Sequence, residues 1–329
     1  MTNSSVNIPR TNITPHTHLS VSELSVSYGE QRALKPLSLE IAGGELIGVI
    51  GPNGAGKTTF IKALCGRVHS EGRIHIDGQL IKKGQDRRKT IGLVPQDIGL
   101  YPQLTVYENL DVMARLLGLS RQKRQEGINT ALFAVSMHDK SKALVRDLSG
   151  GMKRRINVAA AIMHDPSVVI FDEPTAGVDI PARDTVHRLA RDLATQGKAV
   201  ILITHELEQA EALCDKILLL VDGEKRALSA PIDLLMAEFN QDRSVRVRFA
   251  NPPSPETIAA LRPFAFQQSE LPTIWEAMTQ ASEVSFVSAF MTSLKNGDNL
   301  VREITVSRPG LNALMHRIKS ESVNKAYVS

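Results

Sequence analysis

The chain has 329 residues, 42% hydrophobic and 22% charged, which is enough for a full-sized globular domain and a small second one. Its 39 basic and 35 acidic residues leave a net charge of +4, too small to indicate a nucleic-acid-binding protein. Aromatic residues, at 4%, predict a largely aliphatic core, and two cysteines, Cys65 and Cys214, indicate reduced, buried thiols rather than a disulfide framework.

The N-terminal part of the chain predicts an arm followed by strands. Residues 1–18 are rich in Thr, Asn, Ser, Pro and His and lack an apolar core, so we interpret them as a disordered arm and not a signal peptide. Residues 19–28 and 37–41 alternate apolar and polar side chains, which predicts two half-buried strands. We expect both to be antiparallel and to lie beside the fully apolar strand at residues 46–50.

A glycine-rich loop follows that apolar strand and precedes a predicted helix at residues 60–65. It fits the pattern G-x-x-x-x-G-K-[ST], in which successive N–H groups converge at a helix N-terminus and bind phosphate. We predict that Lys57 reaches the β- and γ-phosphates of a nucleotide and that the Thr58 hydroxyl binds Mg²⁺. The residues predicted to bind the nucleotide are Gly51, Pro52, Asn53, Gly54, Ala55, Gly56, Lys57, Thr58 and Thr59.

Strands and helices alternate over the next part of the chain. A strand is predicted at residues 91–96, and apolar residues at helical spacing predict a helical block over residues 105–165. Further strands are predicted at residues 73–78, 167–171, 199–204 and 217–221, and helices at residues 183–196 and 207–214. The fold class is therefore α/β, a phosphate-loop NTPase with a largely parallel, doubly wound sheet, an antiparallel β subdomain and a helical subdomain. The basic residues 87–89 are expected to be solvated.

The character of the sequence changes near residues 229–231. Strands are predicted at residues 244–249 and 300–306, and helices at residues 255–261 and 309–318. We therefore divide the chain into an arm (1–18), a nucleotide-binding domain (19–228), a small C-terminal α/β domain (229–318) and a tail (319–329).

Two carboxylates end the apolar strand near residue 171. Asp172 is placed to reach Mg²⁺, the usual second anchor of a phosphate-loop site, and Glu173 points elsewhere, where it can polarise an attacking water.

A second anion site is predicted at the start of a helix. Ser149 is a good N-cap, and Gly150 and Gly151 leave bare N–H groups at the positive end of the helix dipole. One nucleotide cannot easily use two such sites unless two chains meet. The basic residues 153–155 that follow are expected to be solvated or to face an acidic partner surface.

Together these motifs strongly resemble the ATP-binding subunit of an ABC transporter over about residues 19–228. That family carries a Walker A loop, a Q-loop glutamine, an LSGGQ signature, a Walker B strand with a catalytic Glu, a D-loop and a switch histidine. The matching residues, in the same order, are 51–59, Gln96, 148–152, 168–173, 176–179 and 203–205. The signature departs from the commonest form at Met152, a position that does not contact phosphate, so we expect no loss of activity.

The resemblance implies roles for individual residues. Tyr28 would stack on adenine, and Gln96 would bind Mg²⁺ or its water and sense the membrane partner. Glu173 would be the catalytic base, His205 would hydrogen-bond the γ-phosphate, and Asp179 would lie at a dimer interface. The implied cofactors are ATP and Mg²⁺.

The resemblance also implies partners and a location. Two copies would close head to tail around two ATP molecules, as a homodimer bound to a separate integral-membrane permease at the cytoplasmic face of the inner membrane. Residues 96–117 would form the groove for the permease, and residues 177–183 and 306–314 look like the ABC-2 export branch. Nucleic acid is not expected as a partner. The alternatives are a soluble ABC ATPase that acts on ribosomes or nucleic acid, and a nucleotide-binding regulator without turnover.

Overall fold

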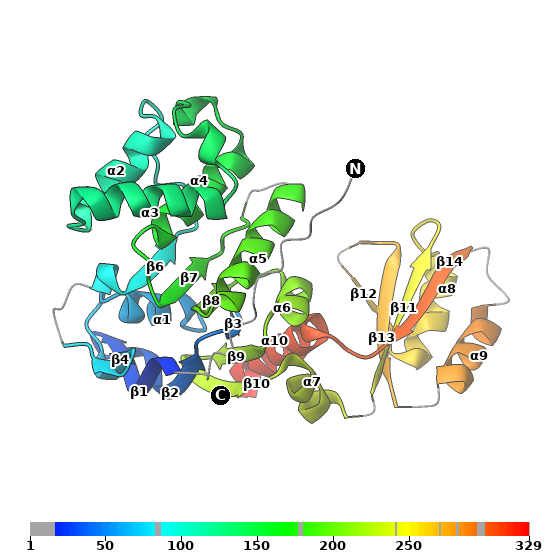
Figure 1. Cartoon of the computed structure of the whole chain (residues 1–329). Coiled ribbons are helices and arrows are strands. Elements are labelled where there is room, and N and C mark those ends of the chain that lie inside the picture. Colours follow the sequence, from blue (N-terminus) through cyan, green and yellow to red (C-terminus); the bar gives the residue numbers. More distant parts are fainter. Residues whose placement is uncertain are drawn as a thin grey trace. The chain divides into compact units, whose positions relative to one another are not determined.

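The computed structural model describes residues 17–82, 87–176, 180–240, 242–269, 271–280, 283–294 and 300–328 (Figure 1). The chain divides into two compact units, Met1–Ala230 and Pro231–Ser329. Of the expected N-terminal arm, residues 1–16 lie outside the described part, and the first strand begins at Thr17. No helix in the described ranges is long and apolar enough to cross a bilayer.

A six-stranded sheet forms the centre of the larger unit. Its strands are, in order across the sheet, β10 (Glu224–Ser229), β9 (Lys216–Val221), β3 (Leu46–Ile50), β8 (Ala199–Ile203), β7 (Val168–Asp172) and β6 (Ile91–Val94). Neighbouring strands are parallel except for β9 and β10, which confirms the predicted, largely parallel sheet. The parallel strands are runs of Val, Ile and Leu because both of their faces are buried. The edge strand β10 was not predicted, and it begins with three charged residues.

A second, antiparallel sheet has the strand order β2-β1-β4-β5. Its strands are β1 (Thr17–Tyr28), β2 (Gln31–Ala42), β4 (Glu71–Ile76) and β5 (Gln79–Leu80). This sheet is the predicted antiparallel subdomain, and its strands are not hydrogen-bonded to β3, which pairs with β8 and β9 on its two sides. The inward side chains of this sheet instead pack with helix α1 (Lys57–Leu64) in one apolar cluster with alternate residues of the central strands. Two more helices, α5 (Ile180–Thr195) and α6 (Leu207–Leu213), also pack against the central strands.

The predicted helical block consists of α2 (Val106–Leu116), α3 (Arg121–Ala134) and α4 (Gly150–Ile162). Each helix begins at a residue whose hydroxyl accepts a backbone N–H: Thr105, Ser120 and Ser149. Thr105 and Glu108 complete a capping box. Figure 1 shows the three helices grouped together, and α4 packs against β6.

The smaller unit follows the split β-α-β-β-α-β arrangement. Its antiparallel sheet has the order β12-β13-β11-β14, formed by β11 (Arg243–Phe249), β12 (Gln267–Gln268), β13 (Ile274–Thr279) and β14 (Val301–Ser307). Its helices are α7 (Pro231–Phe239), α8 (Pro255–Leu261), α9 (Glu283–Ser293) and α10 (Leu311–Val328). The last helix was expected to end at residue 318 but continues to Val328, since neither Gly nor Pro interrupts it.

The two units have different cores. The core of the larger unit is aliphatic, as expected, with few aromatic members such as Phe60 and Phe171. The expectation was wrong for the smaller unit, where Phe249, Phe266, Trp275 and Phe290 are all buried in one cluster. Composition averaged over the whole chain hides this difference, because most of the nine phenylalanines lie after residue 230.

Candidate nucleotide-binding site

The loop between β3 and α1 is built on glycines whose missing side chains leave room for the backbone. A Cβ at Gly51 would lie 2.1 Å from the backbone oxygen of Leu220 in the neighbouring strand β9. Gly56 caps α1 with φ +96°, a left-handed conformation that favours glycine, and no side chain caps the helix. The loop therefore lies tight against β9 and leaves the first N–H groups of α1 without a side-chain acceptor, as a phosphate-binding loop requires.

Gly51→Ala is expected to lower the free energy of unfolding by about 2 kcal/mol, because the clash with a backbone atom is relieved only by moving β3 or β9. The matched control is Gly54→Ala. Gly54 has φ +82° and a Cβ there meets no described atom within 4 Å, so its cost is about 1 kcal/mol of left-handed strain. Chemical denaturation of both variants measures the difference, and equal losses would contradict the close approach at Gly51.

Lys57 points back into the loop that precedes it. Its side chain is buried, and Nζ donates to the backbone oxygens of Gly51 at 2.7 Å and Pro52 at 3.0 Å. Burial lowers the pKa of Lys57, an effect that the charge of Glu173 opposes. The ammonium group is thus held by carbonyl dipoles, and phosphate oxygens at this place would be stronger, charged acceptors.

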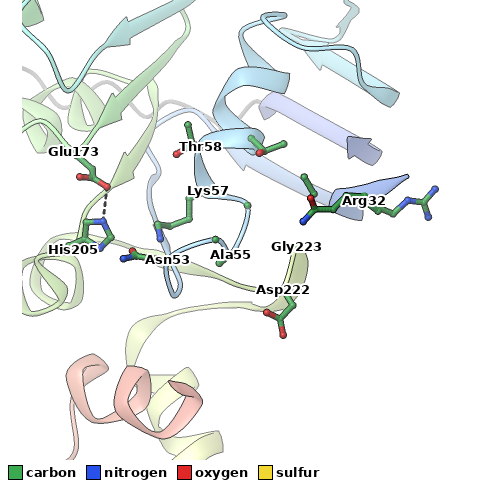
Figure 2. Close-up of a pocket in the computed structure, with 14 residues that line it drawn as sticks. Arg32, Asn53, Ala55, Lys57, Thr58, Glu173, His205, Asp222 and Gly223 are labelled. Carbon is green, nitrogen blue, oxygen red and sulfur yellow. Dashed lines mark ion pairs between the residues drawn. The ribbon is translucent and has the colours of Figure 1, made fainter. Parts of the chain in front are cut away.

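A cavity of about 530 Å³ opens in front of this loop (Figure 2). Its lining residues are Gln31, Arg32, Ala33, Asn53, Gly54, Ala55, Gly56, Lys57, Thr58, Thr59, Glu173, His205, Asp222 and Gly223. The structure therefore gathers seven of the nine predicted loop residues, Glu173 and His205 around one space. That space is of the size usual for small-molecule sites.

Glu173 and His205 face each other across one side of the cavity (Figure 2). They follow the adjacent parallel strands β7 and β8, so both lie at the same edge of the sheet. His205 Nε2 lies 2.7 Å from Glu173 Oε1. Glu173 has φ +47°, a left-handed conformation that is uncommon for a non-glycine residue, and its backbone N–H donates to the oxygen of Ile203.

Asp172 is half-buried and does not line the cavity. Burial raises its pKa, and the neighbouring charge of Glu173 raises it further, whereas Arg67 and Lys62 oppose the shift. A cation beside Asp172 would favour its ionised form against burial and the charge of Glu173, and a carboxylate is a ligand that suits a hard divalent ion.

Five cavity residues were missed by the sequence analysis: Gln31, Arg32, Ala33, Asp222 and Gly223. They come from β2 and from the turn between β9 and β10. Gly223 N–H donates to Ala55 O at 3.3 Å, and Lys35 N–H donates to Gly223 O at 2.7 Å, which fixes this turn between the loop and β2. The Asp-Gly turn was visible in the sequence, but only the tertiary fold brings it to the loop.

Several predicted residues lie away from the cavity. Tyr28 ends β1 with 48% of its surface exposed, and Gln96 is exposed just beyond β6; neither lines the cavity. Gly51 and Pro52 also lie outside the lining. Asp179 lies outside the described residues.

The signature residues form the start of α4. Ser149 and Gly150 are exposed, Gly151 is partly exposed, and none of them lines the cavity of the same chain. Ser149 Oγ accepts the N–H of Met152 at 3.3 Å, the predicted N-cap. The expectation for residues 153–155 was wrong for Arg154, which is 2% exposed.

Comparisons with known proteins agree with this geometry. The family model described as "ABC transporter" matches residues 34–176. The chain is 39% identical over 217 residues to the Nod factor export ATP-binding protein I of Burkholderia orbicola, covering 65% of this chain and 71% of that protein. It is 38% identical over 218 residues to the linearmycin resistance ATP-binding protein LnrL of Bacillus subtilis, covering 66% and 70%.

Solved structures of ABC transporter components are also similar to this chain. An ATP-binding subunit of an ABC transporter superposes with a TM-score of 0.59 at 30% identity, covering 68% of this chain and 94% of that one. cbiO1 from Clostridium perfringens, part of the ABC transporter complex cbiONQ, superposes with a TM-score of 0.61 at 26% identity, covering 68% and 92%.

Proposed function

The chain belongs to the ABC transporter family as an ATP-binding subunit that hydrolyses ATP, and from this premise we propose how its residues act and what it drives. The observation that carries the proposal is the convergence of the phosphate loop, Glu173 and His205 on one cavity. Binding, water activation and γ-phosphate contact are then all available at a single place.

We assign ATP binding to the loop residues 51–59. The backbone N–H groups at the start of α1 and the Lys57 ammonium neutralise the phosphates, and Tyr28 stacks on adenine from the end of β1. Thr58, Asp172 and Gln96 are the proposed Mg²⁺ ligands, directly or through water. When bound, the metal supplies positive charge to the leaving phosphates.

We assign water activation to Glu173 and γ-phosphate contact to His205. In the structure these two side chains pair with each other, so each must release the other before it can serve the substrate. Their separation leaves a carboxylate acceptor for the water proton and a ring nitrogen for the phosphate. The transition state is stabilised mainly by positioning and charge.

A second copy of the chain is proposed to complete each site. Ser149 and Gly151 present bare helix N–H groups outward, and they do not line the cavity of their own chain. Head-to-tail pairing would place this anion site against the phosphates bound by the partner's loop. The working form is then a homodimer with two shared sites.

The proposed transport direction is export through a separate membrane permease, with the chain held peripherally at the cytoplasmic face of the inner membrane. The relatives named above are an export ATP-binding protein and a resistance ATP-binding protein. They favour transport over a soluble ATPase that acts on ribosomes or nucleic acid. Intact Lys57, Asp172, Glu173 and His205 disfavour a regulator without turnover.

The permease contact is proposed in the segment 96–117. Tyr101 there is 53% exposed, while its backbone is fixed by Asn109: Tyr101 N–H donates to Asn109 Oδ1 at 2.7 Å, and Asn109 Nδ2 donates to Tyr101 O at 3.0 Å. The ring can therefore be replaced without loss of the loop that carries it.

Tyr101→Glu is expected to lower the amount of the chain bound to membranes that contain its permease at least about tenfold. Loss of an aromatic anchor and burial of a charge both weaken an interface. Phosphate release by the purified chain should stay within about twofold of wild type, since the cavity is untouched. Phe133→Glu is the matched control, because Phe133 is 64% exposed on the same group of helices. Release by Phe133→Glu but not by Tyr101→Glu would refute this groove, and absence of ATP hydrolysis by the wild type would refute the function.

A further inference from the structure

Helix α4, which begins at the signature, carries a buried cation. Arg154 is 2% exposed, and Asn157, one turn later on the same face, is 3% exposed. Arg155 is only partly buried, and its guanidinium donates at the surface to Ser136 O at 3.4 Å. Of these two neighbouring arginines, only Arg154 is therefore buried, and Arg155 lies near solvent.

The two buried side chains reach the backbone on both sides of Gln96. Arg154 Nη1 donates to Pro95 O at 2.9 Å, and Asn157 Nδ2 donates to Asp97 O at 3.1 Å. These bonds join residues that are about sixty positions apart in the chain. The turn that carries Gln96 is thus attached to α4 at two carbonyl groups.

Arg154 also contacts the segment that follows β7. Its Nη2 lies 3.5 Å from Ala176 O, and Ala176 is the residue before the segment 177–179 that contains Asp179. One guanidinium therefore joins three segments: α4, the turn after β6, and the residues after Glu173.

This arrangement is a poor way to stabilise the fold. Burial lowers the pKa of Arg154, with Asp97 opposing the shift, and Nε has no hydrogen-bond partner in the described part of the chain. Even buried ion pairs are often replaced by apolar side chains without loss of stability, so the burial of this charge is weak evidence that it stabilises the fold. A side chain that is costly to bury, and that holds only main-chain carbonyls, serves to position those carbonyls.

We propose that Arg154 and Asn157, here called the α4 brace, are positioning residues that fix Gln96 to the signature helix. The proposal rests on the assignment of Gln96 and Ser149 to ATP hydrolysis. The brace makes the turn after β6 and the N-terminus of α4 move as one body. When the permease displaces residues 96–117, Ser149 then moves with them, and this changes the site shared with the second copy.

The kinetic test uses the full chain. Arg154→Met is expected to lower kcat for ATP hydrolysis at least about tenfold, because displacing a catalytic group by about 1 Å costs this much or more. KM should change by less than about twofold, because the phosphate loop is intact. Arg154→Lys, which retains the charge but has no fork to bridge two carbonyls, should lose a similar factor. Arg155→Met is the matched control and should match wild type.

A double-mutant cycle separates positioning from general damage. If Arg154 acts through Gln96, Arg154→Met should change kcat by less than about twofold in a Gln96→Ala background. The same large loss in both backgrounds, or loss in Arg155→Met equal to that in Arg154→Met, overturns the brace. A wild type that does not hydrolyse ATP refutes the proposed function, and the brace is then decided by hydrogen exchange.

Hydrogen exchange needs no turnover. Amides in residues 94–98 should exchange at least about tenfold faster in Arg154→Met than in wild type, while those in Arg155→Met stay unchanged. Unchanged protection of residues 94–98 in Arg154→Met overturns the proposal regardless of the kinetic result.

Discussion

Glu173→Gln is expected to lower the rate of ATP hydrolysis at least about a hundredfold, the range that a positioned general base supplies. The amide keeps the shape of the side chain but cannot accept the proton of the attacking water. ATP affinity should stay within about threefold, because the phosphate loop and Lys57 are unchanged. Phosphate release and binding of a fluorescent ATP analogue measure the two quantities.

The same variant should accumulate as an ATP-bound dimer, since turnover normally ends the closed state. Size-exclusion chromatography with and without ATP detects this species. Glu126→Gln is the control, because Glu126 is an exposed carboxylate on α3 that bonds only to Gln122 in the described structure. Hydrolysis by Glu173→Gln at the wild-type rate would show that another group activates the water.

Much of the site could be predicted because its residues have fixed positions along the chain. Phosphate loops need glycine, Lys and Thr at set spacings, and the family resemblance assigned Glu173 and His205 to the same nucleotide. The structure brings these two residues together because the adjacent parallel strands β7 and β8 end at one edge of the sheet. Their 2.7 Å pairing was not expected, because it depends on the left-handed backbone of Glu173.

The rest depended on contacts between distant segments. The turn at Asp222 and Gly223 reaches the cavity only because it bonds to Ala55 and Lys35. Sequence also does not reveal the burial of a charge. Arg87 was expected in solvent, but it is 8% exposed and donates to the carbonyl oxygen of Leu64 at 3.1 Å, at the end of α1. Arg154 was missed for the same reason.

The smaller unit was harder to predict than the larger one. Strand β13 was not predicted, although Ile274, Trp275 and Ala277 are buried in it. The short run lies between a proline-containing turn and polar residues and matches neither a helical nor a clean alternating pattern. Its position in the sheet is fixed by pairing with β11, a contact that is non-local in sequence.

Ser149→Arg is expected to lower kcat at least about a hundredfold, comparable to removal of a main oxyanion-binding group. The long side chain blocks the bare N–H groups at the start of α4, which we assign to the partner's ATP. Because the variant keeps its own loop, binding of the fluorescent ATP analogue should be unchanged within about threefold. Loss of the N-cap alone costs about 1 kcal/mol of stability, so folding must be checked.

Ser120→Arg supplies that check, because Ser120 caps the neighbouring helix α3 in the same way, its Oγ accepting the N–H of Lys123 at 3.4 Å. This control should retain wild-type hydrolysis despite the same lost cap. If each site takes Lys57 from one chain and Ser149 from the other, then mixing equal amounts of Ser149→Arg and Lys57→Ala chains creates heterodimers with one intact site. Random pairing should therefore restore about a quarter of wild-type turnover to two inactive preparations. A site contained within one chain predicts no recovery at any mixing ratio, because every chain in the mixture would carry a defect in its own site.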